Sequence, residues 1–268
     1  NFNIMKKQVK QSFPIVLIFI GFTLMSFAVA NNVLLRLHLK EGEKSTITVK
    51  STMLTTMKVQ GQSINSTQSI DIVQDMLVKK VSDTANIIES EVKSMKMSQS
   101  QMGMSLTYDS EHPEKTSPML ATAVKAIEKD LNKPFTTTLD ECGKVIEVSE
   151  EIAINNLPNV VIALPKDEIH VGSTWSNAIT KEASGKEFSA TMTYTVKEIT
   201  KKNVVLDIAG AIDSSAEVSG TYEGTANISV KTGLVTTESL KQNLSMTVSE
   251  QGLSIPITIS GTTNITLE

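Results

Sequence analysis

The chain has 268 residues, 40% of them hydrophobic and 20% charged, which is enough to bury a sizeable core in one or two domains. Its 29 acidic residues outnumber its 25 basic ones, and Arg36 is the single arginine. Phosphate contacts and anionic membrane surfaces require clustered cations, so this composition excludes nucleic acid as a partner and argues against docking to anionic lipid headgroups. The single cysteine, Cys142, cannot form an internal disulfide.

Residues 1–30 have the three parts of a secretory signal peptide. A basic region with Lys6, Lys7 and Lys10 precedes an uncharged apolar run over 13–27 and an Ala-x-Ala sequence that ends at Ala30. We therefore expect cleavage near Ala30 and export of the mature chain to the periplasm, the cell envelope or the medium. The alternative is an uncleaved N-terminal membrane anchor, for which the apolar run is short against the ~30 Å of membrane hydrocarbon.

Alternation of apolar and polar residues predicts β-strands in the first half of the chain. The apolar residues keep one parity within each of two segments: Ile47, Val49, Met53, Met57 and Val59, then Ile70, Ile72, Met76 and Val78. Successive side chains of a strand point to opposite faces, so a period of two indicates a sheet with one buried face and one solvent-facing face.

The next stretch, "MKMSQSQMGM" over 95–104, holds two Met-x-Met pairs. Met95 and Met97 share one strand face, and Met102 and Met104 share another. The change of parity between the pairs predicts a bulge or a turn near Ser98–Gln101.

A single amphipathic helix is predicted near residues 117–132. Ser117 suits the N-cap position and Pro118 the first helical position. Leu120, Val124, Ile127 and Leu131 form an apolar stripe at helical spacing. Pro134 ends the pattern, and residues 150–165 are predicted to form a connector that includes a short helix.

Strict alternation dominates the second half of the chain. It appears in "FSATMTYTV" from 188, in "VSGTYEGTANISVK" from 218 and in "SIPITISGTTNITL" from 254. Several of these strands reach a dozen residues, where about 5–6 is typical. Long strands rich in Ser and Thr on the polar face are typical of an extended antiparallel sheet.

Matching turns suggest that the chain repeats itself. Gly42 and Gly172 each precede a strand meander, and Gly143 and Gly233 each lie in a hairpin near the end of one. We therefore predict a signal peptide over 1–30, an N-terminal meander half with the helix over 31–149, a connector over 150–165, and a C-terminal meander half over 166–268 that is a pseudo-repeat of the first.

One helix cannot cover the apolar face of so long a sheet if the sheet is flat. We therefore predict a mainly β fold, in which long antiparallel meanders form one or two strongly curved sheets of half-barrel or clam-like shape. The main helix near residues 117–132 would partly plug this curve. An incompletely plugged curve leaves a cavity.

Three segments carry a resemblance to a known family: "LTYDSEHPE" (106–114), "FTTTLDECGKVIEVS" (135–149) and "LPKDEIHVGSTW" (164–175). In this order they resemble an uncharacterised family of exported bacterial proteins of unknown function. At the level of fold, the chain is also similar to curled-sheet lipoprotein carriers, which hold acyl chains against an apolar concave face. The resemblance implies no activity, because fold does not imply function.

The methionines of residues 95–104 admit three interpretations: a copper site, the lining of an apolar pocket, or plain core. Thioethers are soft ligands that select Cu(I), but methionine more often packs than ligates, and the cluster contains no His or Cys. We therefore predict no metal and no cofactor. Cys142 lies beside Asp140 and Glu141, whose charges oppose a thiolate, so its thiol is predicted to be inert.

No arrangement of residues indicates an enzyme. His38, His112 and His170 are scattered without the spacing of a metal site, and the run from Asp109 to His112 has no nucleophile elbow near it. We therefore predict that the protein is not an enzyme.

Two functional hypotheses remain. In the first, an exported soluble protein binds a lipid or another apolar small molecule on its curved sheet, driven by burial of methylenes at ~0.8 kcal/mol each. The candidate lining comes from both halves of the chain: Met53, Met57, Met95, Met102, Phe188, Met192, Tyr194 and Tyr222. In the alternative, the protein is a structural or protein-interaction module of the cell envelope with a packed core, no ligand and an envelope protein as its partner. The strand with Pro256 would then be an exposed edge, because proline cannot donate to a ladder.

Overall fold

A computed structural model describes residues 32–82, 84–149, 160–183, 186–212, 218–250 and 253–268 of the chain. The predicted signal peptide and residues 150–159 of the predicted connector lie outside these ranges. Among the described residues, no helix is both long enough and apolar enough to span a membrane.

The first meander begins after the turn at Gly42 and contains one helical region. Its elements are β1 (Lys44–Val59), β2 (Gln62–Val81), β3 (Asn86–Gln101), β4 (Met104–Asp109), the 3-10 turns η1 (Pro113–Lys115) and η2 (Pro118–Leu120), α1 (Ala121–Asp130), β5 (Phe135–Leu139) and β6 (Val145–Val148). The elements described in the second meander are all strands: β7 (Thr174–Ala183), β8 (Lys186–Ile199), β9 (Asn203–Ile212), β10 (Val218–Ser229), β11 (Val235–Glu250) and β12 (Leu253–Leu267). The predicted mainly β fold with one main helix is confirmed.

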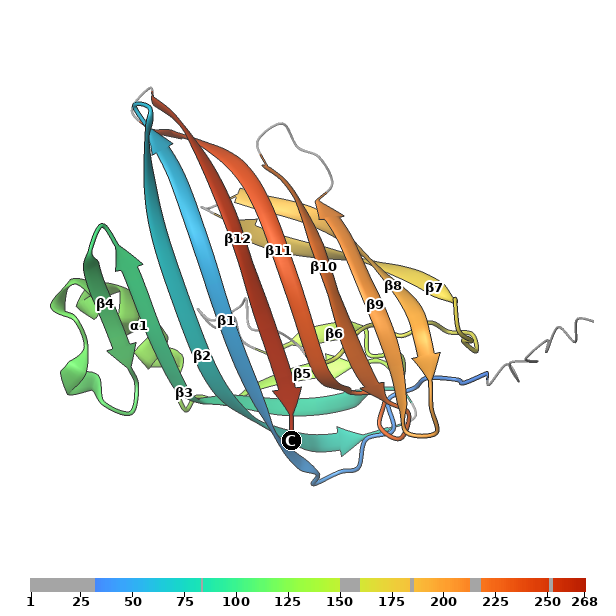
Figure 1. The fold of residues 1–268 in the computed structure, drawn as a ribbon. Coiled ribbons are helices and arrows are strands. Elements are labelled where there is room, and N and C mark those ends of the chain that lie inside the picture. Colours follow the sequence, from blue (N-terminus) through green and yellow to red (C-terminus); the bar gives the residue numbers. More distant parts are fainter. Residues whose placement is uncertain (1–31, 83, 150–159, 184–185, 213–217, 251–252) are drawn as a thin grey trace, which may run out of the picture.

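All of these strands belong to one antiparallel sheet. Within the described residues the strand order is β6-β5-β3-β2-β1-β12-β11-β10-β9-β8-β7, and β4 pairs with β3 outside this path. Figure 1 shows the sheet curving strongly, so that β5 and β6 lie behind the long central strands. The sequence did not decide between one sheet and two, and the described strands form one sheet.

The last strand, β12, joins the two meanders. It pairs with β1 from Ile257 to Leu267 and with β11 from Leu253 to Thr266. The prediction that the Pro256 strand forms an edge is therefore wrong for the strand as a whole. The proline is accommodated because pairing with β1 stops at Ile257, so no β1 residue lies opposite Pro256.

The predicted turn within the methionine stretch is displaced towards the C-terminus. Ser98 and Gln99 remain paired to both β2 and β4, and β3 continues to Gln101. The chain reverses at Met102 and Gly103, which both have positive φ, of 50° and 81°. A two-residue turn of this kind matches the twist of the two strands that it joins.

The helix packs its apolar stripe against the first meander. Leu120 and Val124 are buried, and Ile127 and Leu131 pack beside them. Ser117 does not cap the helix as predicted: its hydroxyl accepts a hydrogen bond from the Thr107 N–H at 2.9 Å, which ties the helical region to β4.

Two extended segments, 33–39 and 160–169, cross one end of the curved sheet, which we call the packed end. Along the first segment Leu35, Leu37 and Leu39 are buried, and along the second Val160, Ile162, Leu164 and Ile169 are buried. The two segments pair where the Val33 and Ile169 backbones exchange hydrogen bonds of 2.9 Å. Arg36 adds to this joint, because its guanidinium donates to the Pro165 carbonyl at 2.9 Å.

The hairpins of the sheet that contain Gly143 and Gly233 pack closely against these two segments. Gly143 has a φ of 80°, and a Cβ there would lie 2.6 Å from the Val161 side chain. Gly233 has a φ of 75°, and a Cβ there would overlap the Arg36 carbonyl oxygen. Only glycine combines positive φ with so close an approach. Gly143 and Gly233 thus occupy matching places in the two meanders, while the predicted boundaries between the halves stay a prediction.

Candidate binding surface on the inner face

The register of the sheet fixes which side chains share its inner face, the face that carries the buried Ile47 and Val49 of β1. Met53 lies on that face, opposite Gln68 of β2 and Gly261 of β12. The pairing carries this row across the sheet through Gln99, Gln68, Met53, Gly261, Gln242, Tyr222, Gly210, Met192 and Asn177. The row separates the packed end from the rest of the inner face, which we call the open end.

Three glutamines of this row, Gln68, Gln99 and Gln242, form what we call the amide belt. The Gln68 Nε2 donates to the Met97 Sδ at 3.4 Å, and the Gln242 Nε2 donates to the Met53 Sδ at 3.6 Å.

The third glutamine of the belt has a stronger acceptor. The Gln99 Nε2 donates to the Ser66 hydroxyl at 3.1 Å. One step towards the packed end, the hydroxyls of Ser51 and Thr263 lie 3.0 Å apart. The belt is therefore polar and uncharged.

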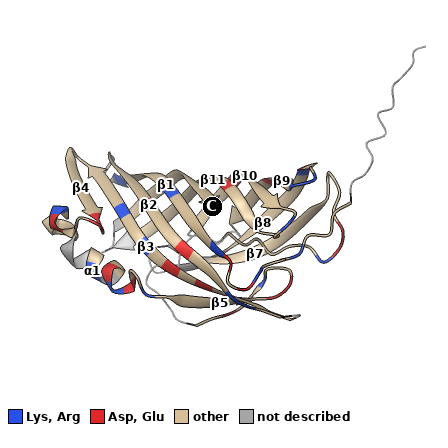
Figure 2. Cartoon of the chain, turned by 90° about the horizontal axis from the view of Figure 1, so that it is seen from below, with Lys and Arg blue, Asp and Glu red and all other residues tan. Residues whose placement is uncertain are grey.

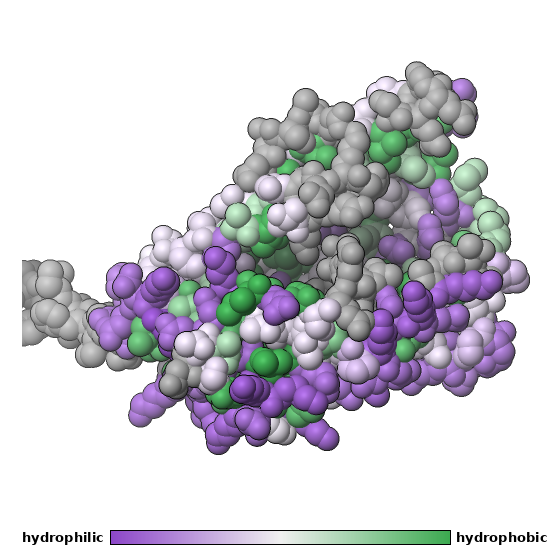
Figure 3. Space-filling view, turned by 180° about the vertical axis from the view of Figure 1, so that it is seen from behind, coloured by the Kyte–Doolittle hydropathy of each residue, from purple (hydrophilic) through white to green (hydrophobic). Residues whose placement is uncertain are grey.

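Beyond the belt, towards the open end, the inner face is apolar on β12 and on β11 from Leu244 to Val248, while Thr55 and Ser66 add hydroxyls on β1 and β2. Met57 pairs with Ile64 of β2 and with Ile257 of β12, and Ile257 in turn pairs with Met246 of β11. We call the half-buried side chains of this region the open band: Met57, Ile64, Ile257 and Ile259. Their neighbours Leu244 and Met246 on β11 are buried in the second-meander core. Seen from behind, the molecule is hollowed, and apolar side chains show in and around the hollow (Figure 3).

Part of this apolar surface lacks a protein covering among the described residues. Met53, Met57 and Ile64 are only half-buried and belong to neither core cluster, whereas Ile47 and Val49 of the same face are 2% exposed. Ile257 and Ile259 are also half-buried, although they pack at the margin of the second-meander cluster. A half-buried apolar strip on a concave face is the surface that an apolar ligand would cover.

Of the eight side chains predicted to line a site, the seven that the structure describes do not gather in one place. Met53 and Met57 lie on the inner face at the belt and in the open band. Met192 and Tyr222 share the row of Met53 but are buried in the second-meander core.

The other four predicted side chains lie elsewhere. Met95 is buried in the first-meander core. Met102 is 76% exposed at the β3–β4 turn, away from the inner face. Tyr194 is buried one row closer to the packed end than Met192. The side chain of Phe188 lies outside the described part of the chain.

Tyr194 helps to anchor the second crossing segment. Its ring stacks on Trp175 with centroids 5.4 Å apart, and the Trp175 indole N–H donates to the Ala163 carbonyl at 3.0 Å. The Asn177 amide donates to the same carbonyl at 2.9 Å. Burial, reinforced by the charge of Glu238, raises the pKa of Tyr194 to about 12. These residues therefore hold the protein together rather than face a ligand.

Cys142 is a free thiol that is buried in the structure. Burial raises the pKa of the Cys142 thiol, which suits an inert side chain. The described residues contain no cluster of three or more His, Cys, Asp or Glu side chains that could hold a metal ion.

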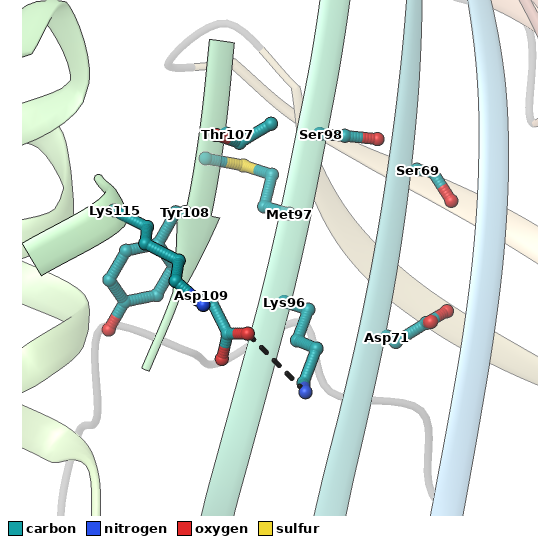
Figure 4. Close-up of a pocket in the computed structure, with 9 residues that line it drawn as sticks. All are labelled: Ser69, Asp71, Lys96, Met97, Ser98, Thr107, Tyr108, Asp109 and Lys115. Carbon is teal, nitrogen blue, oxygen red and sulfur yellow. Dashed lines mark ion pairs between the residues drawn. The ribbon is translucent and has the colours of Figure 1, made fainter. Parts of the chain in front are cut away.

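Charged residues recur along β1, β2 and β3 and around α1 (Figure 2). The clearest group lines a groove of ≈ 300 Å³ beside β4 (Figure 4). There the Lys96 ammonium lies 3.4 Å from Asp109 and 2.7 Å from Glu111. The pair of carboxylates raises the pKa of Lys96, so the lysine stays charged and its charge is compensated within the protein. This groove therefore holds a local ion-pair network on the outer surface.

A protein-family model described as "Family of unknown function (DUF6263)" matches residues 83–156 and 147–235, more than half of the chain. The chain belongs to this family. The regions matched to DUF6263 contain both glycine hairpins that clamp the crossing segments. No curated protein matches the chain.

Two solved structures illustrate how distant its structural neighbours are. An outer membrane channel from Pseudomonas putida F1 is 8% identical over 87% of this chain and 97% of that chain, with a TM-score of 0.24. The translocator domain of the autotransporter NalP from Neisseria meningitidis is 7% identical over 84% of this chain and 89% of that chain, with a TM-score of 0.23. Likenesses at this level carry no argument about function.

Proposed function

We propose that this member of DUF6263 is an exported binding protein that holds an apolar, lipid-like ligand on the inner face of its curved sheet. The observation that carries the proposal is the exposure of Met53, Met57 and Ile64, which lie on the inner face but outside both core clusters. Covering apolar surface contributes about 25 cal/mol per Å², so a chain of methylenes laid along this strip would bind without any directional contact. No catalytic role is proposed.

The proposed location rests on the N-terminal sequence. A basic region, an apolar run and an Ala-x-Ala end favour export, with the mature chain in the periplasm or the cell envelope or outside the cell. The ligand would therefore be an apolar molecule available in that compartment, and the composition argues against nucleic acid.

A titration with an uncharged apolar fluorophore, N-phenylnaphthylamine, tests the proposal on the chain from residue 31 onwards. Met57→Glu places a charge in the open band, and we expect it to weaken binding at least about tenfold, or 1.4 kcal/mol. Leu54→Glu is the matched control, because Leu54 lies on the outer face of the same strand and is 43% exposed. It should leave the affinity unchanged.

Absence of probe binding, or equal effects of the two substitutions, would contradict the proposal and favour the alternative, an interaction module that pairs with an envelope protein. One observation supports that alternative. The edge strand β6 pairs only with β5 among the described residues, and its apolar residues Val145, Ile146 and Val148 are all exposed. Such an edge is available to a partner strand.

A further inference from the structure

The amide belt lies where the inner end of a bound apolar chain would stop. On β1 the row that contains the belt passes through Met53, and the open band continues from there through Met57 towards the end of the strand. On β12 the distance from Gly261 at the belt to Ile255 is about 20 Å at the usual rise of a strand. A ligand that lies along the open band would therefore bring one of its ends to this row, within reach of Gln68 or Gln242.

The hydrogen bonds of the belt are only partly committed to the protein. Gln68 and Gln242 donate to the thioethers of Met97 and Met53, at 3.4 Å and 3.6 Å. A thioether is a weak acceptor, so a ligand oxygen would make a stronger hydrogen bond with either amide. Each carboxamide also has two N–H donors and a carbonyl acceptor, which lets it bind a group that both donates and accepts.

The surroundings of the belt disfavour a charged ligand group. At the inner-face positions of β1, β2 from Ile64 to Val78, β11 and β12 there is no Lys or Arg among the described residues. Glu238 and Glu250 of β11 are the acidic residues at these positions, four and eight residues from Gln242, or about 13 Å and 26 Å along the strand. A carboxylate or phosphate at the belt would lose its hydration without gaining a cation.

We propose that the amide belt is a specificity site that selects apolar ligands whose polar end is uncharged, such as a hydroxyl, ester or amide group. This inference rests on the proposed function and deepens it. The open band supplies the non-directional part of the affinity, and the amide of Gln68 or of Gln242 turns from sulfur to the ligand oxygen.

Three amphiphiles with the same twelve-carbon tail test the proposal: lauroyl glycerol, which is uncharged, laurate, which is an anion, and dodecyltrimethylammonium, which is a cation. The affinity of each amphiphile is measured by its competition with N-phenylnaphthylamine for the chain from residue 31 onwards. We expect lauroyl glycerol to bind at least about tenfold more tightly than either ion, and Gln242→Leu to remove most of that preference.

The control is Asn243→Leu, because Asn243 is the next residue of β11 and is exposed on the outer face. It should leave the preference intact. Probe affinity and urea unfolding of Gln242→Leu show that the variant is folded, and Gln68→Leu provides a second variant if it is not.

The outcomes separate this inference from the proposed function. Equal binding of all three amphiphiles, or an unchanged preference in both glutamine variants, overturns the amide-belt proposal while the binding function stands. Tighter binding of the cation also overturns it, and would indicate attraction of the ligand by the carboxylate of Glu238. Failure of the probe itself to bind overturns both proposals.

Discussion

The two ends of the curved sheet have the same strands and the same alternation but different environments. At the packed end, Ile47 of β1 and Ile265 of β12 are 2% and 3% exposed. At the open end of the same strands and the same face, Met57 and Ile257 are half-buried. An apolar residue at every second position is therefore not sufficient for burial.

The packed end is buried because two segments of the chain cover it. The segments 33–39 and 160–169 cross the packed end and contribute buried leucines, isoleucines and valines. They are held by backbone hydrogen bonds to both glycine hairpins, for example from Leu37 N–H to the Glu141 carbonyl at 2.9 Å and from His38 N–H to the Thr232 carbonyl at 3.0 Å. The packed end is therefore core, whereas the described residues leave Met57 and Ile257 at the open end half-buried.

Truncating one isoleucine at each end should give the largest contrast. We expect Ile265→Ala to lower the free energy of unfolding by about 3–4 kcal/mol, because it leaves a cavity in a close-packed core. Ile257→Ala, on the same strand and face, should lower it by about 1 kcal/mol, because the side chain is already half-exposed. Urea unfolding monitored by circular dichroism measures both, and equal losses would mean that the open end is as tightly packed as the other.

Adding one methyl group at a glycine turn should give the next largest contrast. Gly233→Ala is expected to cost about 3 kcal/mol, because the new Cβ meets the Arg36 backbone and alanine disfavours positive φ. Gly61→Ala, at the β1–β2 turn of the open end, has a φ of 82° with no atom within 4 Å of the new Cβ, so only about 1 kcal/mol is expected. Thermal and urea unfolding of the pair check this difference, which vanishes if the crossing segments are not clamped.

Tyrosine ionisation should give the smallest contrast, because it appears only at high pH. The chain has three tyrosines, and burial raises the pKa of Tyr108, Tyr194 and Tyr222 above the usual 10. Tyr194 should ionise last, near pH 12. A raised tyrosine pKa favours the folded state fully below pH 10, and this contribution is lost as the pH rises towards 12.

Absorbance at the phenolate band measures this titration, with Tyr194→Phe to assign the last transition. Unfolding in urea at the same pH values should show stability falling from about pH 10 upwards. A Tyr194 transition near pH 10 in the folded protein would contradict its burial beneath the crossing segment.

Much of the fold was predictable from particular residues. The parity of Ile47 to Met57 and of Ile255 to Leu267 predicted both strands, and the stripe from Leu120 to Leu131 predicted the helix. The same parity could not show that β1 and β12 pair, because these strands are about two hundred positions apart and nothing local records their register. For that reason the interior position of the Pro256 strand was not foreseen.

The candidate site was predictable only in part. Met53 and Met57 were found because methionines at strand parity indicate an apolar face. Met102 is also a methionine but lies at a turn, and the position of that turn depends on where the pairing of β3 with its neighbours stops. The glutamines of the amide belt were not predicted, although Gln68 shares the parity of Ile70 and Ile72, because an amide at strand parity does not by itself indicate a ligand-facing position.

The sequence by itself determined that this protein is a long antiparallel sheet with one apolar face, because side-chain alternation is a local property of each strand. Only the tertiary structure decided which part of that face is core and which part is open. That distinction depends on the crossing segments, the glycine hairpins and the register between distant strands. These are contacts between residues far apart in the chain, and the free energy that selects them comes from packing rather than from any local pattern.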